Sequence, residues 1–150
     1  DPYRNVIGIF LNQCRHGQAM KIFGDGRQTR AFTHVEDVAP LIARAPLIEA
    51  ARNSVFNVGA DQPVSVLDLA HQVAQAMGVT AAVEHLPARP EVVHAIADHH
   101  KAQAAFAPPS QLPLADGLAR MAAWLKTIEP APPRRFVGIE VPDQLPANWR

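Results

Sequence analysis

The sequence predicts a mixed α/β fold made of a few short strands with four or five helices around them. Stretches with apolar residues at helical spacing alternate along the chain with short apolar or alternating runs, which is typical of this class. Of the 150 residues, 48% are hydrophobic and 19% are charged, a balance that suits one globular core. We therefore expect a single domain over residues 1–128 and a proline-rich extended tail over residues 129–150.

The first third of the chain predicts a helix, two strands and a second helix. A Gly-Asp-Gly turn at residues 24–26 separates the two strands. Glu36 and Asp37 supply the acidic residues that favour a helix N-terminus. The expected elements are a helix at 5–15, strands at 21–23 and 30–35, and a helix from residue 36 to residue 45.

The clearest helix lies at residues 66–77, where Ser65 and Asp68 resemble a capping box and Gly78 ends the apolar stripe. Before it, the apolar segment SVFNVG at 54–59 predicts a buried strand, which would leave an open edge unless it joins a larger sheet. The remaining expected elements are strands at 83–86 and 95–97 and helices at 98–106 and 114–125.

Charge and composition exclude several classes of protein. Fourteen basic and fourteen acidic side chains balance, so no overall positive field favours nucleic acid. No apolar run approaches the roughly 20 residues that span a bilayer. The single cysteine, Cys14, forms no internal disulfide and fits a cytoplasmic location. Its place on the apolar face of a helix favours packing over reactivity.

The residues that would bind NAD or catalyse hydride chemistry are not found in the sequence. Gly24 and Gly26 begin like a dinucleotide-binding turn, but a strand pattern follows where a helix should open. The only tyrosine is Tyr3, and Ile7 lies one helical turn later, so the chain has no tyrosine-lysine pair at that spacing. We expect no catalytic residue and no cofactor-binding residue in this chain.

A metal site is also not expected, although the chain has seven histidines. Asp98, His99 and His100 are adjacent, and His94 lies four residues before Asp98. Successive residues on a helix point about 100° apart, so they rarely converge on one ion. The pattern favours a solvated helix start.

One segment, KIFGDGRQTRAFTHVEDV at residues 21–38, resembles the signature in the second half of extended short-chain dehydrogenases. This is the NAD-dependent epimerase/dehydratase family that includes UDP-glucose 4-epimerase. Four further segments follow the family's order: DPYRNVIGIFLNQ, FNVGADQPVSVLDLA, RPEVVHAIADHHKAQAAF and PLADGLARMAAWL. The resemblance covers roughly residues 2–127. It implies the C-terminal, substrate-binding portion of an extended Rossmann-type epimerase, without the complete dinucleotide-binding sheet.

The resemblance implies that the full enzyme oxidises a sugar hydroxyl by hydride transfer to NAD and then reduces the keto intermediate on its other face. NAD would lie in a half upstream of Asp1, so this chain would bind a UDP-sugar without catalysing the reaction alone. Within the family we favour the UDP-hexose 4-epimerase branch, although decarboxylases and dehydratases share the same segment. The implied partner is an N-terminal Rossmann half or a second copy of the chain.

Seven residues match the family's nucleotide-sugar site. By resemblance, Asn5 and Val6 lie at the helix start near the diphosphate, and Lys21 and Phe23 line the uracil. Arg30 matches the arginine that pairs with the diphosphate, for which a guanidinium offers a planar fork of donors. The alternatives are a simple helix cap for Asn5, core packing for Phe23 and a solvated charge for Arg30.

Arg89 and Glu91 match the family's phosphate-binding arginine and ribose-binding acid. The family often reads Arg-x-Gly-acid, whereas this chain reads Arg-Pro-Glu, one residue shorter. The alternative for both is a solvated loop charge. Asp37, Asn57 and Asp68 resemble residues with structural roles.

A second functional hypothesis is a non-enzymatic module that dimerises or docks on a partner, because the SVFNVG strand would leave an apolar face open. A nucleic-acid binder has little support, since Arg134 and Arg135 are the only basic pair of the tail.

Overall fold

The computed structural model of the chain describes residues 5–129, so almost all of the expected tail, and Tyr3, lie outside the described residues. It confirms the mixed α/β class. None of the helices in the described range is long and apolar enough to cross a membrane. The helices are α1 (Val6–Arg15), α2 (Val35–Arg44), α3 (Val66–Met77), α4 (His100–Phe106) and α5 (Leu114–Thr127), with 3-10 turns at Ala45–Leu47 and Glu49–Ala51. The strands are β1 (Met20–Phe23), β2 (Thr29–Ala31), β3 (Pro63–Ser65), β4 (Val83–Leu86) and β5 (His94–Ala95).

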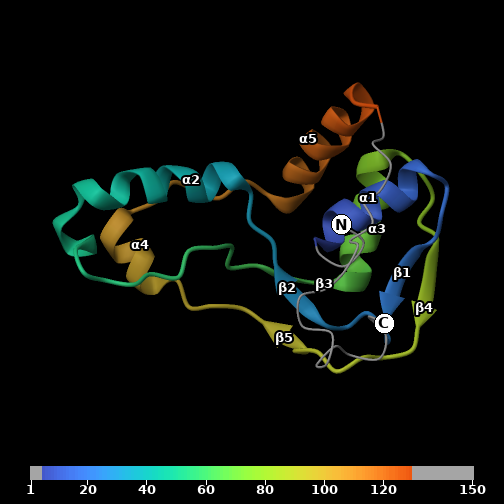
Figure 1. Ribbon diagram of the computed structural model, residues 1–150, viewed down its shortest axis with the longest axis horizontal. Coiled ribbons are helices and arrows are strands. Elements are labelled where there is room, and N and C mark those ends of the chain that lie inside the picture. The colour runs from blue at the N-terminus through green and yellow to red at the C-terminus, as the bar shows by residue number, and fades with distance from the viewer. Residues whose placement is uncertain (1–4, 130–150) are drawn as a thin grey trace, which may run out of the picture.

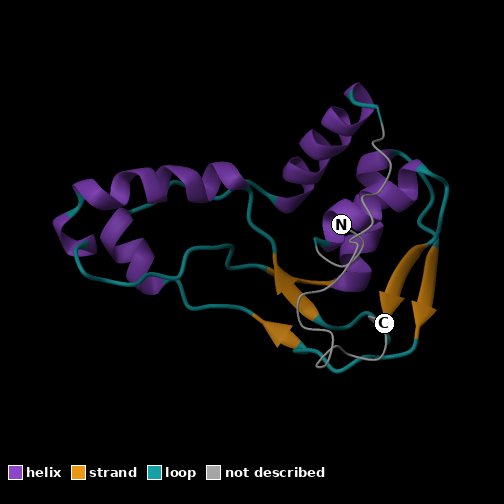
Figure 2. Ribbon diagram, in the orientation of Figure 1, coloured by secondary structure: helices purple, strands orange, loops and turns teal. Residues whose placement is uncertain are grey.

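Two small sheets organise the chain. In one, β1 and β4 run parallel, with Phe23 opposite Leu86. In the other, β2 lies between antiparallel β3 and parallel β5. Helices α1, α3 and α5 gather beside the β1–β4 pair, while α2 and α4 lie together at the other end of the molecule (Figure 1). The three-stranded sheet lies between these two groups, as the strand colouring shows (Figure 2).

Helix α3 forms the centre of the main core. Leu69, Ala70 and Val73 have no exposed surface, and α1 and α5 pack against the same helix. Burial of one such aliphatic side chain contributes about 1.5–3 kcal/mol. The ends of α3 agree with the sequence prediction: the Ser65 hydroxyl accepts a hydrogen bond from the Asp68 backbone N–H at 3.0 Å. At the other end, Gly78 adopts φ 72° in a left-handed cap.

A smaller core joins α2 to α4. Its buried members are Leu41 of α2 with Ala102 and Phe106 of α4. Phe56 packs its ring edge-on against Phe106, with 5.0 Å between the ring centroids. This contact holds the loop that carries Phe56 against α4. The continuation of this loop and helix α4 both line a second cavity, which is described below.

The predicted strand at residues 54–59 is wrong, because these residues form no strand in the structure. Val55 is 85% exposed, and its carbonyl accepts a hydrogen bond from the Lys101 ammonium at 2.9 Å. A strand requires a hydrogen-bonded neighbour. Within residues 5–129, no strand pairs with this segment.

Other element boundaries differ by a few residues. The strand predicted at 30–35 is β2, Thr29–Ala31, because Val35 already begins α2 and the His34 ring accepts the Glu36 backbone N–H at 3.2 Å. The strand predicted at 95–97 is β5, His94–Ala95, in register with β2. The helix predicted at 98–106 begins at His100, and β3 has no counterpart among the predicted elements.

Cys14 packs against the main core from α1. Burial raises the pKa of its thiol above the usual value. A neutral, partly covered thiol agrees with the packing role expected from the sequence.

Substitution of Gly26 by alanine should destabilise the fold more than the same change at Gly17. Both glycines have positive φ, 79° and 64°, which costs an alanine about 1 kcal/mol. A Cβ at Gly26 would also lie 3.0 Å from the Leu67 Cβ, whereas nothing lies within 4 Å at Gly17. We expect Gly26→Ala to lower the free energy of unfolding by about 2–3 kcal/mol. Urea titration checks this, and equal losses in the two variants would contradict it.

Ala107→Gly should stabilise the protein. Ala107 ends α4 at φ 42° and ψ 59°, a left-handed conformation that glycine adopts without steric cost. We expect the free energy of unfolding to rise by about 0.5–1 kcal/mol. As a matched control, Ala104→Gly on the exposed side of the same helix should lower it by about 1 kcal/mol. Thermal unfolding of both variants measures the two signs, and a lower melting temperature for Ala107→Gly would refute the assignment.

Candidate functional site

A cavity of about 350 Å³ lies between α1, β1 and the segment that follows β4. This volume is within the usual range of small-molecule pockets. All seven residues predicted from the sequence, Asn5, Val6, Lys21, Phe23, Arg30, Arg89 and Glu91, line it. Residues up to 86 positions apart in the sequence, from Asn5 to Glu91, therefore line one cavity. Gln13 and Gln28, which the sequence analysis did not single out, also line it.

Strand pairing explains why these residues meet. Because β1 and β4 are parallel and in register, the segment that leaves β4 at Leu86 starts beside Phe23 at the end of β1. The Gly24 backbone N–H continues this pairing with a hydrogen bond to the Leu86 carbonyl at 3.0 Å. After the glycine turn, β2 carries Arg30 opposite Ala95 of β5, so the chain from 89 to 95 follows the edge of the cavity.

Glu91 contacts three side chains of the site, those of Arg30, Arg89 and Gln28. Its Oε2 atom lies 3.3 Å from the Arg30 Nη2 atom and 3.6 Å from the Arg89 Nη2 atom. Its Oε1 atom accepts a hydrogen bond from the Gln28 amide at 3.3 Å, and the same amide donates to the Phe23 carbonyl at 3.0 Å. The Arg-Pro-Glu spacing, one residue shorter than the usual family pattern, therefore still brings the acid into the cavity.

Phe23 is more than a core residue. It is half-buried, and the guanidinium of Arg89 lies 4.2 Å from the centroid of its ring. This is the geometry of a cation–π contact, which contributes about 0.5–1 kcal/mol at partly exposed sites. Arg89 thus contacts both the aromatic ring and the Glu91 carboxylate.

The N-terminus of α1 opens at the same cavity. Asn5 is its cap, since its side-chain oxygen accepts a hydrogen bond from the Gly8 N–H at 3.3 Å. The first backbone N–H groups of a helix have no partner within the helix and favour an anion. On the facing strand, the Lys21 backbone N–H donates to the Gln13 side-chain oxygen at 3.3 Å. Gln13 therefore links α1 to β1 at the floor of the cavity.

The charges of this cavity favour an anion. Among its lining residues, three carry a positive charge (Lys21, Arg30 and Arg89) and one carries a negative charge (Glu91). A net positive lining attracts a diphosphate or a similar polyanion.

A second cavity of about 470 Å³ lies between α2 and α4 and has the opposite character. Three acidic residues, Glu36, Asp37 and Asp61, line it, together with Arg44 and His99. The acidic lining disfavours a diphosphate. Although this cavity is larger, charge selects the smaller one as the candidate site.

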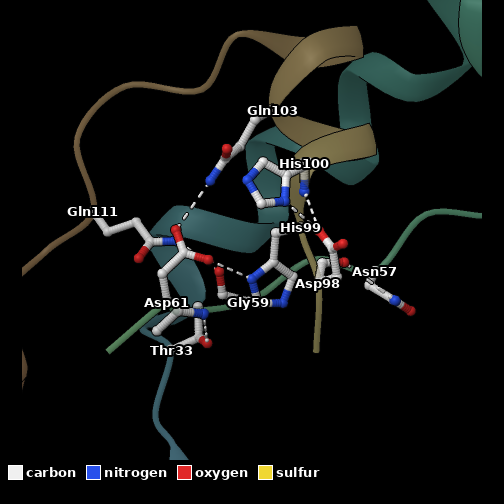
Figure 3. Close-up of polar contacts among 10 residues, drawn as sticks. Thr33, Asn57, Gly59, Asp61, Asp98, His99, His100, Gln103 and Gln111 are labelled. Carbon is white, nitrogen blue, oxygen red and sulfur yellow. Dashed lines mark hydrogen bonds and ion pairs between the residues drawn. The ribbon is translucent and has the colours of Figure 1, made fainter. Parts of the chain in front are cut away.

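The polar groups of the second cavity are engaged with one another (Figure 3). The buried His99 ring contacts the Asp61 carboxylate at 2.6 Å, and the Gln103 amide donates to the other carboxylate oxygen at 3.0 Å. The Gln111 amide donates to the Gly59 carbonyl at 2.6 Å. These bonds join the loop at 59–61 to α4 and to the segment that follows it, which indicates a structural network.

The histidines weighed as metal ligands have different partners. His99 faces Asp61, whereas His100 pairs with Asp98 at 2.6 Å. The His100 backbone N–H also donates to Asp98, and this hydrogen bond is the main cause of the lowered pKa of the Asp98 carboxyl. Among residues 5–129, no group of three or more His, Cys, Asp or Glu side chains is arranged to hold a metal ion.

The glycine pair does not form a dinucleotide-binding turn. Gly24 and Gly26 both adopt positive φ, but the chain continues into β2 and not into a helix N-terminus. The described residues therefore do not fit the pyrophosphate of NAD in the manner of a Rossmann turn.

Comparisons with known proteins agree with the resemblance seen in the sequence. The family model for the NAD dependent epimerase/dehydratase family matches residues 1–59. A putative UDP-glucose 4-epimerase of Methanocaldococcus jannaschii is 32% identical over 123 residues, which is 81% of this chain and 39% of that protein.

Two solved structures share the fold. A UDP-glucuronic acid 4-epimerase variant from Bacillus cereus, in complex with UDP-4-deoxy-4-fluoro-glucuronic acid and NAD, is 26% identical, with a TM-score of 0.76. The match covers 84% of this chain and 40% of that one. An epimerase from Methanothermobacter thermautotrophicus is also 26% identical, with a TM-score of 0.78, over 83% of this chain and 38% of that one.

The chain spans about two fifths of the length of the curated relative and of the two solved structures named here. The order of the family-like segments, the shared fold and the matching family model agree with one another. The chain belongs to the NAD-dependent epimerase/dehydratase family of extended short-chain dehydrogenases, and it corresponds to a part of those enzymes.

Proposed function

We propose that this chain binds the nucleotide portion of a UDP-sugar in the cavity between α1 and β1. It would serve as the substrate-binding part of an NAD-dependent sugar-nucleotide epimerase of the UDP-hexose 4-epimerase type. The observation that carries the proposal is the gathering of Lys21, Arg30 and Arg89 around one cavity at the open N-terminus of a helix.

Each lining group has a chemical role in this proposal. Arg30 and Arg89 offer planar forks of N–H donors to the diphosphate oxygens. The free N–H groups at the start of α1, next to Asn5, add to the same anion site. The Phe23 ring and the backbone of β1 suit a planar base, and the Glu91 carboxylate suits ribose hydroxyls as an acceptor.

The chemical step would belong to the remainder of the full-length enzyme. In the family proteins, NAD supplies the oxidation and reduction of the sugar. The described residues of this chain bind and orient the nucleotide, and the catalytic residues would come from the part of its relatives that the chain does not match. We place this binding unit at residues 1–128, in the cytoplasm, where a single free cysteine is stable.

A second candidate function is a dimerisation or docking module derived from this fold. Ile42, Leu47 and Val55 are 66%, 85% and 85% exposed and lie at the end of the molecule that holds α2 and α4. The neighbouring segment at 54–58 is extended chain that belongs to no strand. A chain that forms a stable dimer in solution and shows no affinity for UDP would favour this function.

Calorimetric titration of the chain with UDP, UDP-glucose and NAD tests the main proposal. We expect UDP and UDP-glucose to bind and NAD not to bind. Arg30→Gln should weaken UDP binding at least tenfold, because a charged hydrogen-bond donor to the diphosphate is lost. Arg30→Lys should restore only part of the affinity, because an ammonium does not reproduce the fork.

Arg27→Gln is the matched control. Arg27 lies three residues before Arg30, in the turn that leads into β2; its side chain is 87% exposed and pairs with Asp25 outside the cavity. It should leave UDP affinity unchanged. Equal effects of the two substitutions, or binding of UDP that survives Arg30→Gln in a folded protein, would refute the assignment. Thermal unfolding of each variant separates lost binding from lost structure.

A further inference from the structure

Glu91 lies where a diphosphate would bind. Its Oε2 atom is shared by the Nη2 atoms of Arg30 and Arg89, at 3.3 and 3.6 Å. We infer that Glu91 is an internal competitor of the ligand: its carboxylate holds both arginines in the empty site, and a diphosphate exchanges with it on binding. This inference rests on the proposed function and adds to it the group that holds the two arginines before the ligand binds.

The hydrogen bonds of Arg30 bring the Glu91 carboxylate next to the donors that a diphosphate would use. Its Nη1 atom donates to the carbonyls of Thr29 and Val93, at 2.7 and 3.3 Å, and so is committed to the backbone of β2 and of the segment before β5. The other terminal nitrogen, Nη2, is the one that contacts Glu91. A phosphate oxygen that binds the second N–H of this nitrogen would lie beside the Glu91 carboxylate, and the repulsion between the two negative charges favours exchange.

Arg89 extends the same exchange to the base subsite. Its guanidinium covers one face of the Phe23 ring at 4.2 Å while it contacts Glu91. When Arg89 turns to a diphosphate, it leaves both the carboxylate and the ring face. One movement thus frees a cation for the diphosphate and an aromatic surface for a planar base.

Gln28 retains the displaced carboxylate within the site. Its amide donates to the Glu91 Oε1 atom at 3.3 Å and to the Phe23 carbonyl at 3.0 Å, so it is anchored to β1. The oxygen that Gln28 holds is the one that the arginines do not contact. After the exchange, the carboxylate keeps this bond, and its freed Oε2 atom can accept a hydrogen bond from a ribose hydroxyl.

Removal of Glu91 changes anion binding in opposite directions for two possible roles of this residue. In the first role, Glu91 only orients the two arginines. In that case its removal would disorder the guanidinium groups and weaken anion binding. If Glu91 competes, removal of its charge must strengthen the binding of an anion that has no ribose. Inorganic pyrophosphate is such an anion, and the sign of the change decides between the two roles.

The experiment is a calorimetric titration of wild type, Glu91→Gln and Glu84→Gln with inorganic pyrophosphate and with UDP. We expect Glu91→Gln to bind pyrophosphate about five- to tenfold more tightly than wild type, since the arginine pair is only a quarter to a third exposed. UDP should gain less than pyrophosphate, because the variant lacks the charged acceptor for ribose. Glu84→Gln removes the same charge from an exposed position on β4 outside the cavity, and it should match wild type.

The outcomes separate the two proposals. If wild type binds UDP but Glu91→Gln binds pyrophosphate no better than wild type, the exchange is wrong and the nucleotide site stands. If wild type and both variants bind neither ligand, both proposals fail. If Glu84→Gln tightens pyrophosphate binding as much as Glu91→Gln, general charge explains the effect and the exchange is overturned. Thermal unfolding confirms that each variant is folded before it is titrated.

Discussion

The packing of α3 against α1, α5 and β1 is the contact on which the rest of the structure depends. The completely buried face of α3, formed by Leu69, Ala70 and Val73, meets apolar residues of both neighbouring helices and of β1. This packing holds α1 in position against β1, and the candidate site lies where those two elements meet. The glycine turn after β1 also lies against α3, because the Leu67 N–H donates to the Gly26 carbonyl at 3.0 Å. The candidate cavity is thus built on the main core, and the segment after β4 adds Arg89 and Glu91 to its lining.

The sequence predicted the helices well, because a 3.6-residue apolar period and the caps at Ser65 and Gly78 are local signals. Strands were harder, since a strand exists only where a neighbour pairs with it. Residues 54–59 have the composition of a buried strand but no partner among residues 5–129, whereas β3, Pro63–Ser65, has weak local signals and pairs with β2. Tertiary context decided both cases.

The sequence indicated several residues of the candidate site but not the contacts between them. The family-like segments indicated seven of the residues that line the cavity. Gln13 and Gln28 had no signal in the sequence, because each acts through an amide that reaches a backbone group of β1. The sharing of Glu91 between two arginines also depends on distances that only the fold sets. Charge, which composition reports as an overall zero, separates into a basic cavity and an acidic cavity once the chain is folded.

The parallel pairing of β1 with β4 has a consequence for the folding kinetics of the chain. The two strands are about 60 residues apart in sequence, so formation of the cavity requires the closure of a long loop that contains α3. A ligand that contacts both Phe23 and Arg89 would act as a non-covalent cross-link across this long loop. It would bind the native state alone and so raise the melting temperature in proportion to the logarithm of its concentration.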